Sequence, residues 1–180
     1  RNRGTLTRPR LTPPGAATYP VRVMTRPDPV YRVTFVCTGN TCRSPMAVVA
    51  LRRALGADGE RVSIESAGTG AWDGQSATEF AIELADRAGG DLRAHRARRL
   101  TPAMARESDL LLVMERSHLA SVRTLDADPS RTHVLSEWPA PGEPDLPISD
   151  PFGASVEAYE ECWRRIERHV TRAREHQVLI

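Results

Sequence analysis

A cysteine and an arginine, Cys37 and Arg43, lie six positions apart in a short polar segment. A helix N-terminus and a nearby cation stabilise a thiolate, so we expect Cys37 to be a nucleophile. The guanidinium of Arg43 presents a planar pair of N–H donors that matches two phosphate oxygens. These two residue types therefore predict attack of Cys37 on phosphorus, giving a covalent phosphocysteine that water later hydrolyses.

The neighbouring residues suit a tight anion-binding loop. The predicted loop comprises Thr38, Gly39, Asn40, Thr41, Cys42 and Ser44. Gly39 permits a positive φ angle, and Asn40 tolerates the left-handed region better than most residues. Ser44 and Pro45 suit the N-cap and the first position of a helix. Backbone N–H groups at such a strand–loop–helix junction can converge on one tetrahedral anion.

A second reactive group, Asp150, lies far along the chain in the segment Asp150-Pro151-Phe152-Gly153. Cleavage of a phosphate ester needs a proton for the leaving group, which a carboxylic acid can supply. The same carboxylate can then activate the water that hydrolyses phosphocysteine. The pattern Asp-Pro-x-Gly also favours a turn with no catalytic role. A turn and a general acid are compatible, because the acid must lie on a loop of fixed position.

The apolar pattern predicts the elements that position these groups. The predicted strands cover residues 32–36, 62–66, 109–114 and 132–135. The predicted helices cover residues 45–55, 76–89, 102–107, 117–124 and 155–175. Their alternation predicts an α/β fold, a small four-stranded parallel sheet flanked by helices on both faces. Ligands then bind at the carboxyl ends of the strands, where Cys37 is placed.

The last predicted helix has the clearest period. Its apolar stripe consists of Val156, Tyr159, Trp163, Ile166 and Val170. This spacing indicates a core-facing side to which we assign no chemistry. On the opposite side we expect two favourable i,i+4 ion pairs, Glu160–Arg164 and Glu161–Arg165.

These motifs together resemble the low-molecular-weight protein-tyrosine phosphatase family. The similar segments are the phosphate loop at 37–45, the cleft segment at 66–72, the stretch at 94–100, the third strand at 109–115 and the acid loop at 148–153. They occur in the family's order, and the similarity spans about residues 31–177. The resemblance implies the family's fold (phosphotyrosine phosphatase I-like) and a hydrolase that needs no cofactor and no metal.

The resemblance also implies a role for each matching position. Cys37 corresponds to the nucleophile, Arg43 to the phosphate clamp and Asp150 to the acid and subsequent base. The polar network that supports the loop corresponds to Asn40, Ser44, Ser66 and His95. Cys42 corresponds to a second loop cysteine, which captures an oxidised nucleophile as a reversible disulfide.

Three positions bear on the substrate, and we expect Thr41, Trp72 and Phe152 to line the cleft. Thr41 and the Phe152-Gly153 pair resemble the bacterial protein-arginine phosphatase branch, where the threonine discriminates phosphoarginine from phosphotyrosine. Trp72 suits stacking on a phenyl ring, but a guanidinium also stacks on tryptophan. We favour phosphoarginine slightly and keep phosphotyrosine open.

Two other functions fit parts of the pattern. An arsenate reductase of the same fold also uses Cys-x5-Arg, but it needs two further cysteines on a mobile segment. Here Cys162 alone remains, on the inward side of a predicted helix. A non-catalytic phosphate-binding module is the other alternative, although binding alone needs neither a thiolate nor an acid.

The length suits one domain, and the resemblance implies that residues 31–180 form a phosphatase domain. Composition predicts a basic, Pro/Arg-rich and flexible extension at 1–30. Residues 1–32 contain seven Arg and one Asp, a net charge of +6, within a chain whose net charge is +2. Three cysteines do not form a disulfide framework, and no apolar run is long enough to span a bilayer. We therefore expect a cytoplasmic monomer or weak dimer that acts on phosphorylated proteins, with no nucleic-acid or membrane partner.

Overall fold

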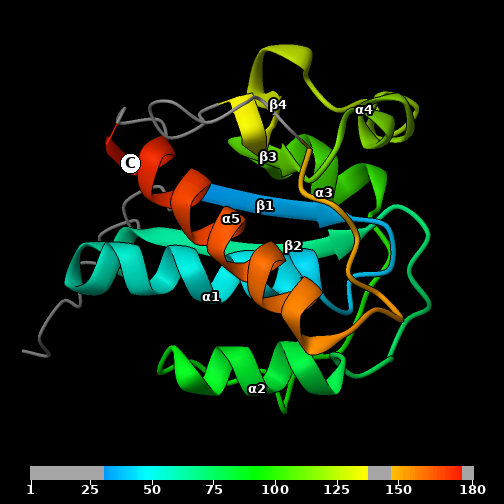
Figure 1. Ribbon diagram of the computed structural model, residues 1–180. Coiled ribbons are helices and arrows are strands. Elements are labelled where there is room, and N and C mark those ends of the chain that lie inside the picture. Colours follow the sequence, from blue (N-terminus) through cyan, green and yellow to red (C-terminus); the bar gives the residue numbers. More distant parts are fainter. Residues whose placement is uncertain (1–30, 138–146, 176–180) are drawn as a thin grey trace, which may run out of the picture.

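The computed structural model describes residues 31–137 and 147–175, and its centre is a four-stranded parallel sheet (Figure 1). The strands are β1 (Tyr31–Cys37), β2 (Val62–Gly68), β3 (Leu110–Val113) and β4 (Thr132–Val134). They are arranged in the order β2-β1-β3-β4, and every neighbouring pair is parallel. The predicted sheet is confirmed, whereas the predicted extension at 1–30 lies outside the described residues.

All five predicted helices are found. They are α1 (Arg43–Leu55), α2 (Glu79–Arg87), α3 (Pro102–Glu107), α4 (Arg116–Arg123) and α5 (Val156–Glu175). Short 3-10 turns occupy Gly56–Arg61, Pro129–Arg131 and Leu135–Glu137. In α3, Thr101 caps the N-terminus by accepting the Met104 N–H, and Pro102 occupies the first turn. No helix within the described ranges is long and apolar enough to cross a membrane.

The helix α2 is shorter at both ends than the prediction of 76–89. Before it, the Thr78 N–H donates to the Thr41 carbonyl at 2.9 Å, which ties this segment to the phosphate loop. After it, Gly89 adopts a φ of +78° and turns the chain. Tertiary contacts and a turn therefore set the bounds of this helix.

Helices cover both faces of the sheet, as predicted (Figure 1). α1 and α5 pack on one face, and α2 packs against these two helices. α3 and α4 contribute to the core on the other face. Along β1 the buried side chains alternate between the two cores, with Phe35 in the first and Val36 in the second.

The inward stripe of α5 is confirmed except at Val156, which is half-buried, and one of the two predicted ion pairs is wrong. Its buried residues include Tyr159, Cys162, Trp163, Ile166 and Val170. Arg165 pairs with Glu161 at 3.0 Å as predicted. Glu160 pairs instead with Arg87 of α2 at 2.9 Å, and Arg164 contacts Glu161 at 3.0 Å. The packing of α2 against α5 thus gives Glu160 a partner outside its own helix.

Candidate active site

The segment joining β1 to α1 encloses the sulfur of Cys37, the last residue of the first strand. The Cys37 side chain is buried, and its Sγ accepts the Asn40 backbone N–H at 3.2 Å. The Ser44 hydroxyl lies 3.0 Å from the same sulfur. Two polar groups therefore face the predicted nucleophile from within its own loop.

Asn40 is the centre of the network that holds this loop. Its Nδ2 donates to the hydroxyls of Ser44 and Ser66, both at 2.9 Å. Its Oδ1 accepts the Arg98 backbone N–H at 2.9 Å, and its carbonyl lies 2.7 Å from His95 Nε2. The four residues predicted to support the loop are thus brought together, and the Arg98 backbone joins them.

The structure decides between the two residues expected to tolerate a left-handed backbone, and it corrects one local prediction for the loop. Of these two residues, Asn40 adopts the left-handed conformation, with a φ of +55°, and Gly39 does not. Asn40 can hold this conformation because five hydrogen bonds to its backbone and side chain fix it. Ser44 is not the N-cap: α1 begins at Arg43 after Cys42, which makes no side-chain capping bond. The Ser44 hydroxyl contacts Cys37 and Asn40 instead.

Gly68, the last residue of β2, allows the neighbouring segment to approach the loop closely. A Cβ at this position would lie 2.4 Å from the Thr38 carbonyl oxygen and 3.0 Å from the Asn40 nitrogen. The next two residues bond to the loop backbone: Thr69 N–H to the Cys37 carbonyl at 2.9 Å and Gly70 N–H to the Thr38 carbonyl at 3.0 Å. We did not identify Gly68 from the sequence, where a glycine ending a strand is the available signal.

Arg43 is buried, with 1% of its side chain exposed, and its terminal nitrogens contact four groups. Nη1 donates to Glu115 Oε1 at 2.9 Å and to the Ile148 carbonyl at 3.1 Å. Nη2 donates to Asp150 Oδ2 at 2.5 Å and to Thr38 Oγ1 at 3.4 Å. Burial alone lowers the pKa of Arg43, but the Glu115 hydrogen bond and the Cys37 and Asp150 charges outweigh it. The charged guanidinium is therefore stabilised, while its Nε has no hydrogen-bond partner among the described residues.

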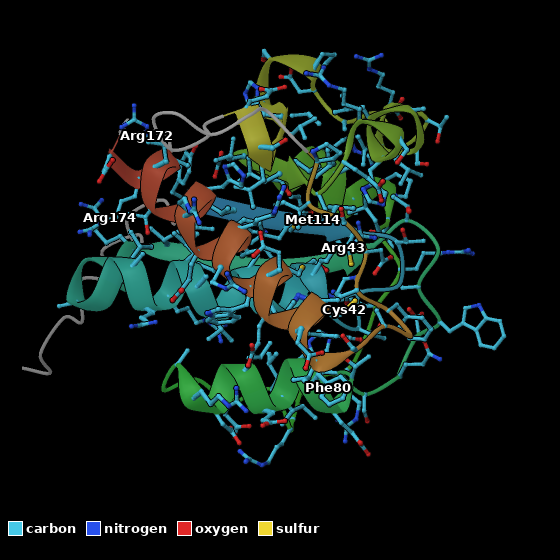
Figure 2. The ribbon with its side chains drawn as sticks, viewed as in Figure 1. Cys42, Arg43, Phe80, Met114, Arg172 and Arg174 are labelled. Atoms are coloured by element: carbon cyan, nitrogen blue, oxygen red, sulfur yellow. The ribbon has the colours of Figure 1, made fainter. Side chains whose placement is uncertain are left out.

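Asp150 reaches the loop although it lies 107 positions after Arg43 in the sequence. Its Oδ1 accepts the Phe152 backbone N–H at 3.2 Å and the Cys42 thiol at 3.5 Å. The carboxylate is 40% exposed, so solvent and a bound molecule can both reach it. The predicted nucleophile, arginine and acid thus belong to one site at the carboxyl end of β1. Figure 2 shows Cys42 and Arg43 at this end.

Two further side chains of the site, Glu115 and His118, were missed in the sequence. Glu115 lies just beyond β3, and an acidic residue following a buried strand is a signal that could have found it. His118 belongs to α4, and its Nε2 lies 3.0 Å from Thr38 Oγ1 and 3.6 Å from Glu115 Oε1. Neither spacing nor periodicity predicts that α4 places a histidine against the loop.

The three cysteines are free and buried, but they differ in their surroundings. Burial raises the pKa of Cys42 far above its ordinary value, and the Cys37 and Asp150 charges add to this effect. Burial likewise raises the pKa of Cys162 to about 12. Cys42 and Cys162 are therefore protonated thiols at neutral pH.

The three residues predicted to line the cleft differ in exposure. Trp72 is 75% exposed and Phe152 is 68% exposed, whereas Thr41 is buried in the loop. The Thr41 hydroxyl makes no hydrogen bond within residues 31–137 and 147–175. Two large aromatic surfaces are thus available to a bound molecule, and the loop offers a hydroxyl without a partner in the described protein.

Comparison with known proteins agrees with this geometry. Residues 32–176 match the family described as low molecular weight phosphotyrosine protein phosphatase. A low molecular weight protein-tyrosine-phosphatase of Streptomyces coelicolor is 36% identical over 145 residues, covering 76% of this chain and 87% of the relative.

Solved structures show the same likeness. The Erwinia amylovora tyrosine phosphatase AmsI superposes with a TM-score of 0.73 at 33% identity, covering 82% of this chain and 93% of that one. The YwlE arginine phosphatase of Geobacillus stearothermophilus gives a TM-score of 0.70 at 31% identity, covering 82% and 94%. The chain therefore belongs to the low molecular weight protein-tyrosine phosphatase family of hydrolases, whose cysteine-based phosphatase chemistry fits the loop that surrounds Cys37.

Proposed function

We propose that Cys37 is the nucleophile, Arg43 the phosphate clamp and Asp150 the general acid and base of a phosphoprotein phosphatase. The contact that supports these roles best is the Arg43–Asp150 pair, because it brings the acid loop to the loop that encloses Cys37. The rest of the phosphate loop then supplies backbone N–H groups to the phosphoryl oxygens.

The Arg43–Asp150 ion pair is present when no substrate is bound, and a substrate phosphate competes with Asp150 for Arg43. When the dianionic phosphoryl group binds Arg43, it takes the place of Asp150 on Nη2. The released Asp150 carboxylate, which solvent can reach, takes up a proton and becomes a carboxylic acid. It donates this proton to the leaving nitrogen or oxygen as the Cys37 S–P bond forms and the bond from phosphorus to the leaving group breaks. Asp150 then removes a proton from water, which attacks phosphorus, breaks the S–P bond and releases inorganic phosphate.

The proposed substrate is a protein phosphorylated on arginine. Support comes from Thr41, whose hydroxyl has no partner among the described residues and can bind a phosphoramidate or a water beside it. The likeness to an arginine phosphatase at 31% identity agrees with this proposal. Trp72 and Phe152 offer faces on which a guanidinium can stack.

A protein phosphorylated on tyrosine is the second candidate. It is favoured by relatives named tyrosine phosphatases, including the Streptomyces coelicolor protein at 36% identity. The exposed ring of Trp72 also suits stacking on a phenyl group.

The first test replaces the nucleophile. Cys37→Ser should lower kcat by roughly three orders of magnitude or more, because a neutral hydroxyl is a far weaker nucleophile than a thiolate. Melting temperature should change little, since sulfur and oxygen differ little in size. Cys42→Ser is the matched control and should retain turnover. Activity that survives in Cys37→Ser would contradict the assignment of Cys37 as the nucleophile. A wild type that hydrolyses neither a phosphoarginine nor a phosphotyrosine peptide would favour a phosphate-binding module.

Substrate choice is tested by the ratio of kcat/KM for matched phosphoarginine and phosphotyrosine peptides. Thr41→Val removes the hydroxyl at constant volume, and Thr41→Ile adds bulk as well. If the hydroxyl selects phosphoarginine, both variants should lower this ratio by about tenfold or more. If volume alone selects, Thr41→Ile acts and Thr41→Val does not. A wild-type preference for phosphotyrosine that neither variant changes would establish the second candidate.

Arsenate reduction has less support. The third cysteine, Cys162, is buried on the inward side of α5, where it cannot move out to relay a disulfide without unpacking the helix. We propose instead that Cys42 protects an oxidised Cys37 by forming a disulfide with it. After mild peroxide treatment, dithiothreitol should restore wild-type activity but much less of the Cys42→Ala activity. Equal recovery would contradict this role.

A further inference from the structure

His118 is a buried histidine that contacts the phosphate loop and has no part in the proposed reaction. It is the third residue of α4 and is 4% exposed. With Val122, one turn later, it forms the buried side of this helix. Packing at such a position needs only an apolar side chain, whereas a buried imidazole has two nitrogens that require partners.

The surroundings of His118 determine which nitrogen carries the hydrogen. Nε2 faces two oxygens, Thr38 Oγ1 at 3.0 Å and Glu115 Oε1 at 3.6 Å, whereas the buried Nδ1 has no partner among the described residues. A carboxylate can only accept, so the hydrogen belongs on Nε2 and the lone pair on Nδ1. Burial lowers the pKa of His118 and outweighs the Glu115 charge, so the ring is neutral at neutral pH.

Both partners of His118 also hold Arg43. Glu115 Oε1 accepts from Nη1 at 2.9 Å, and Thr38 Oγ1 accepts from Nη2 at 3.4 Å. In the proposed reaction Asp150 must leave Arg43 when a phosphate binds. Thr38, Glu115 and the Ile148 carbonyl then remain to orient the guanidinium, and His118 contacts two of these three groups.

We propose that neutral His118 is a positioning residue for Arg43, because its Nε2–H holds the Thr38 hydroxyl and the Glu115 carboxylate against the guanidinium. This inference rests on the proposed function of Arg43. The charged groups facing His118 are Glu115, Arg43 and Asp150. A proton on Nδ1 would place a second cation beside Arg43 and draw Glu115 toward the imidazolium. Acid should therefore loosen the phosphate clamp through His118.

The test compares His118→Gln with His118→Leu in the full chain, using p-nitrophenyl phosphate over a range of pH. A glutamine amide nitrogen can take the place of Nε2 as a donor and does not titrate, whereas leucine fills space without a donor. His118→Leu should lower kcat by about 10²-fold with a smaller change in KM, since misplaced catalytic groups cost this much. His118→Gln should keep kcat within a few-fold of wild type and lose less activity in acid.

Two controls separate positioning from packing. Val122→Ala removes volume from the same side of α4 and should lower the melting temperature without changing the pH profile of kcat. In a Thr38→Val background, His118→Leu should cost much less than in the wild type, because the two residues act through one contact.

The inference would be overturned if His118→Gln and His118→Leu lost kcat equally and in proportion to the fall in their melting temperatures. A wild-type kcat in His118→Leu would overturn it as well. The affinity of the same variants for inorganic vanadate, measured by calorimetry, tests the phosphate clamp without relying on catalytic turnover. Weaker vanadate binding in the Leu variant but not in the Gln variant supports the clamp. A wild type that binds vanadate but hydrolyses no phosphate ester would refute the proposed function and leave this order of affinities intact.

Discussion

The phosphate loop is held from two sides that differ in chemistry. We call the first side the Asn40 network, which consists of Asn40, Ser44, Ser66, His95 and the Arg98 backbone. We call the second side the Arg43 cluster, which consists of Thr38, Arg43, Glu115, His118 and Asp150. The first uses amides, hydroxyls and a neutral imidazole, whereas the second is built around ion pairs.

This difference separates a part that stays fixed from a part that changes partners. Buried neutral groups with every hydrogen bond made are rigid, and Asn40 has a partner for both side-chain atoms and for its carbonyl. Asp150, in contrast, is 40% exposed, and a phosphate can replace it on Arg43. The Asn40 network therefore fixes the shape of the loop, whereas the Arg43 cluster on the other side exchanges its carboxylate for the phosphate.

The largest effect should come from the Arg43 cluster. Asp150→Asn removes the proposed acid and should lower kcat by about 10²–10³-fold for substrates with poor leaving groups. Good leaving groups need the proton less, so their loss should be smaller. Activity is measured on a series of aryl phosphates, with melting temperature as a control for folding. A loss of the same size for every leaving group would count against the acid role.

A variant of the Asn40 network should affect stability as well as activity. Asn40→Ala removes the side-chain hydrogen bonds and leaves an alanine at a φ of +55°, which alanine tolerates less well than asparagine. It should lower the free energy of unfolding by about 2–4 kcal/mol. Asn40→Gly is the matched control, because it accepts this backbone conformation and lacks only the side-chain bonds. Urea unfolding should place Asn40→Gly between the wild type and Asn40→Ala. Unchanged stability in both would show that the network does not hold the loop.

The smallest effect concerns pH and His95. Burial lowers the pKa of His95, and this outweighs the hydrogen bond to the Asn40 carbonyl, which raises it. The unfolded chain, with the ordinary value of 6.5, therefore binds a proton before the folded protein does. Stability consequently falls as pH drops through 6.5 toward the folded-state pKa.

His95→Gln tests this expectation, because the amide can still donate to the Asn40 carbonyl and does not titrate. Its unfolding free energy should fall less than that of the wild type between about pH 7 and pH 5. Its kcat should keep the wild-type pH profile, in contrast to His118→Gln. If the stability profiles of His95→Gln and the wild type coincide, His95 does not contribute to acid sensitivity.

Much of the fold could be predicted because its signals are local. The run of β-branched and aromatic residues in β1 is typical of a buried strand, and the three-to-four spacing in α5 reflects the period of a helix. Cys37 and Arg43 share a loop, so their spacing alone suggests their joint chemistry. The role of Asp150 came from its resemblance to a family motif, since nothing within a few residues of it indicates a partner 107 positions away.

The tertiary structure decided the contacts that no local period encodes. The parallel pairing of β1 with β2 brings Gly68 against the loop. The pairing of β1 with β3 places Glu115, just beyond β3, next to Arg43. Packing of α4 delivers His118 to Thr38, and packing of α2 takes Glu160 away from its predicted helical partner. The sequence by itself determined the elements and the reactive loop, because these depend on neighbours within about one helical turn. The partners of Arg43 depend on sheet order and helix packing, so only the folded chain could reveal them.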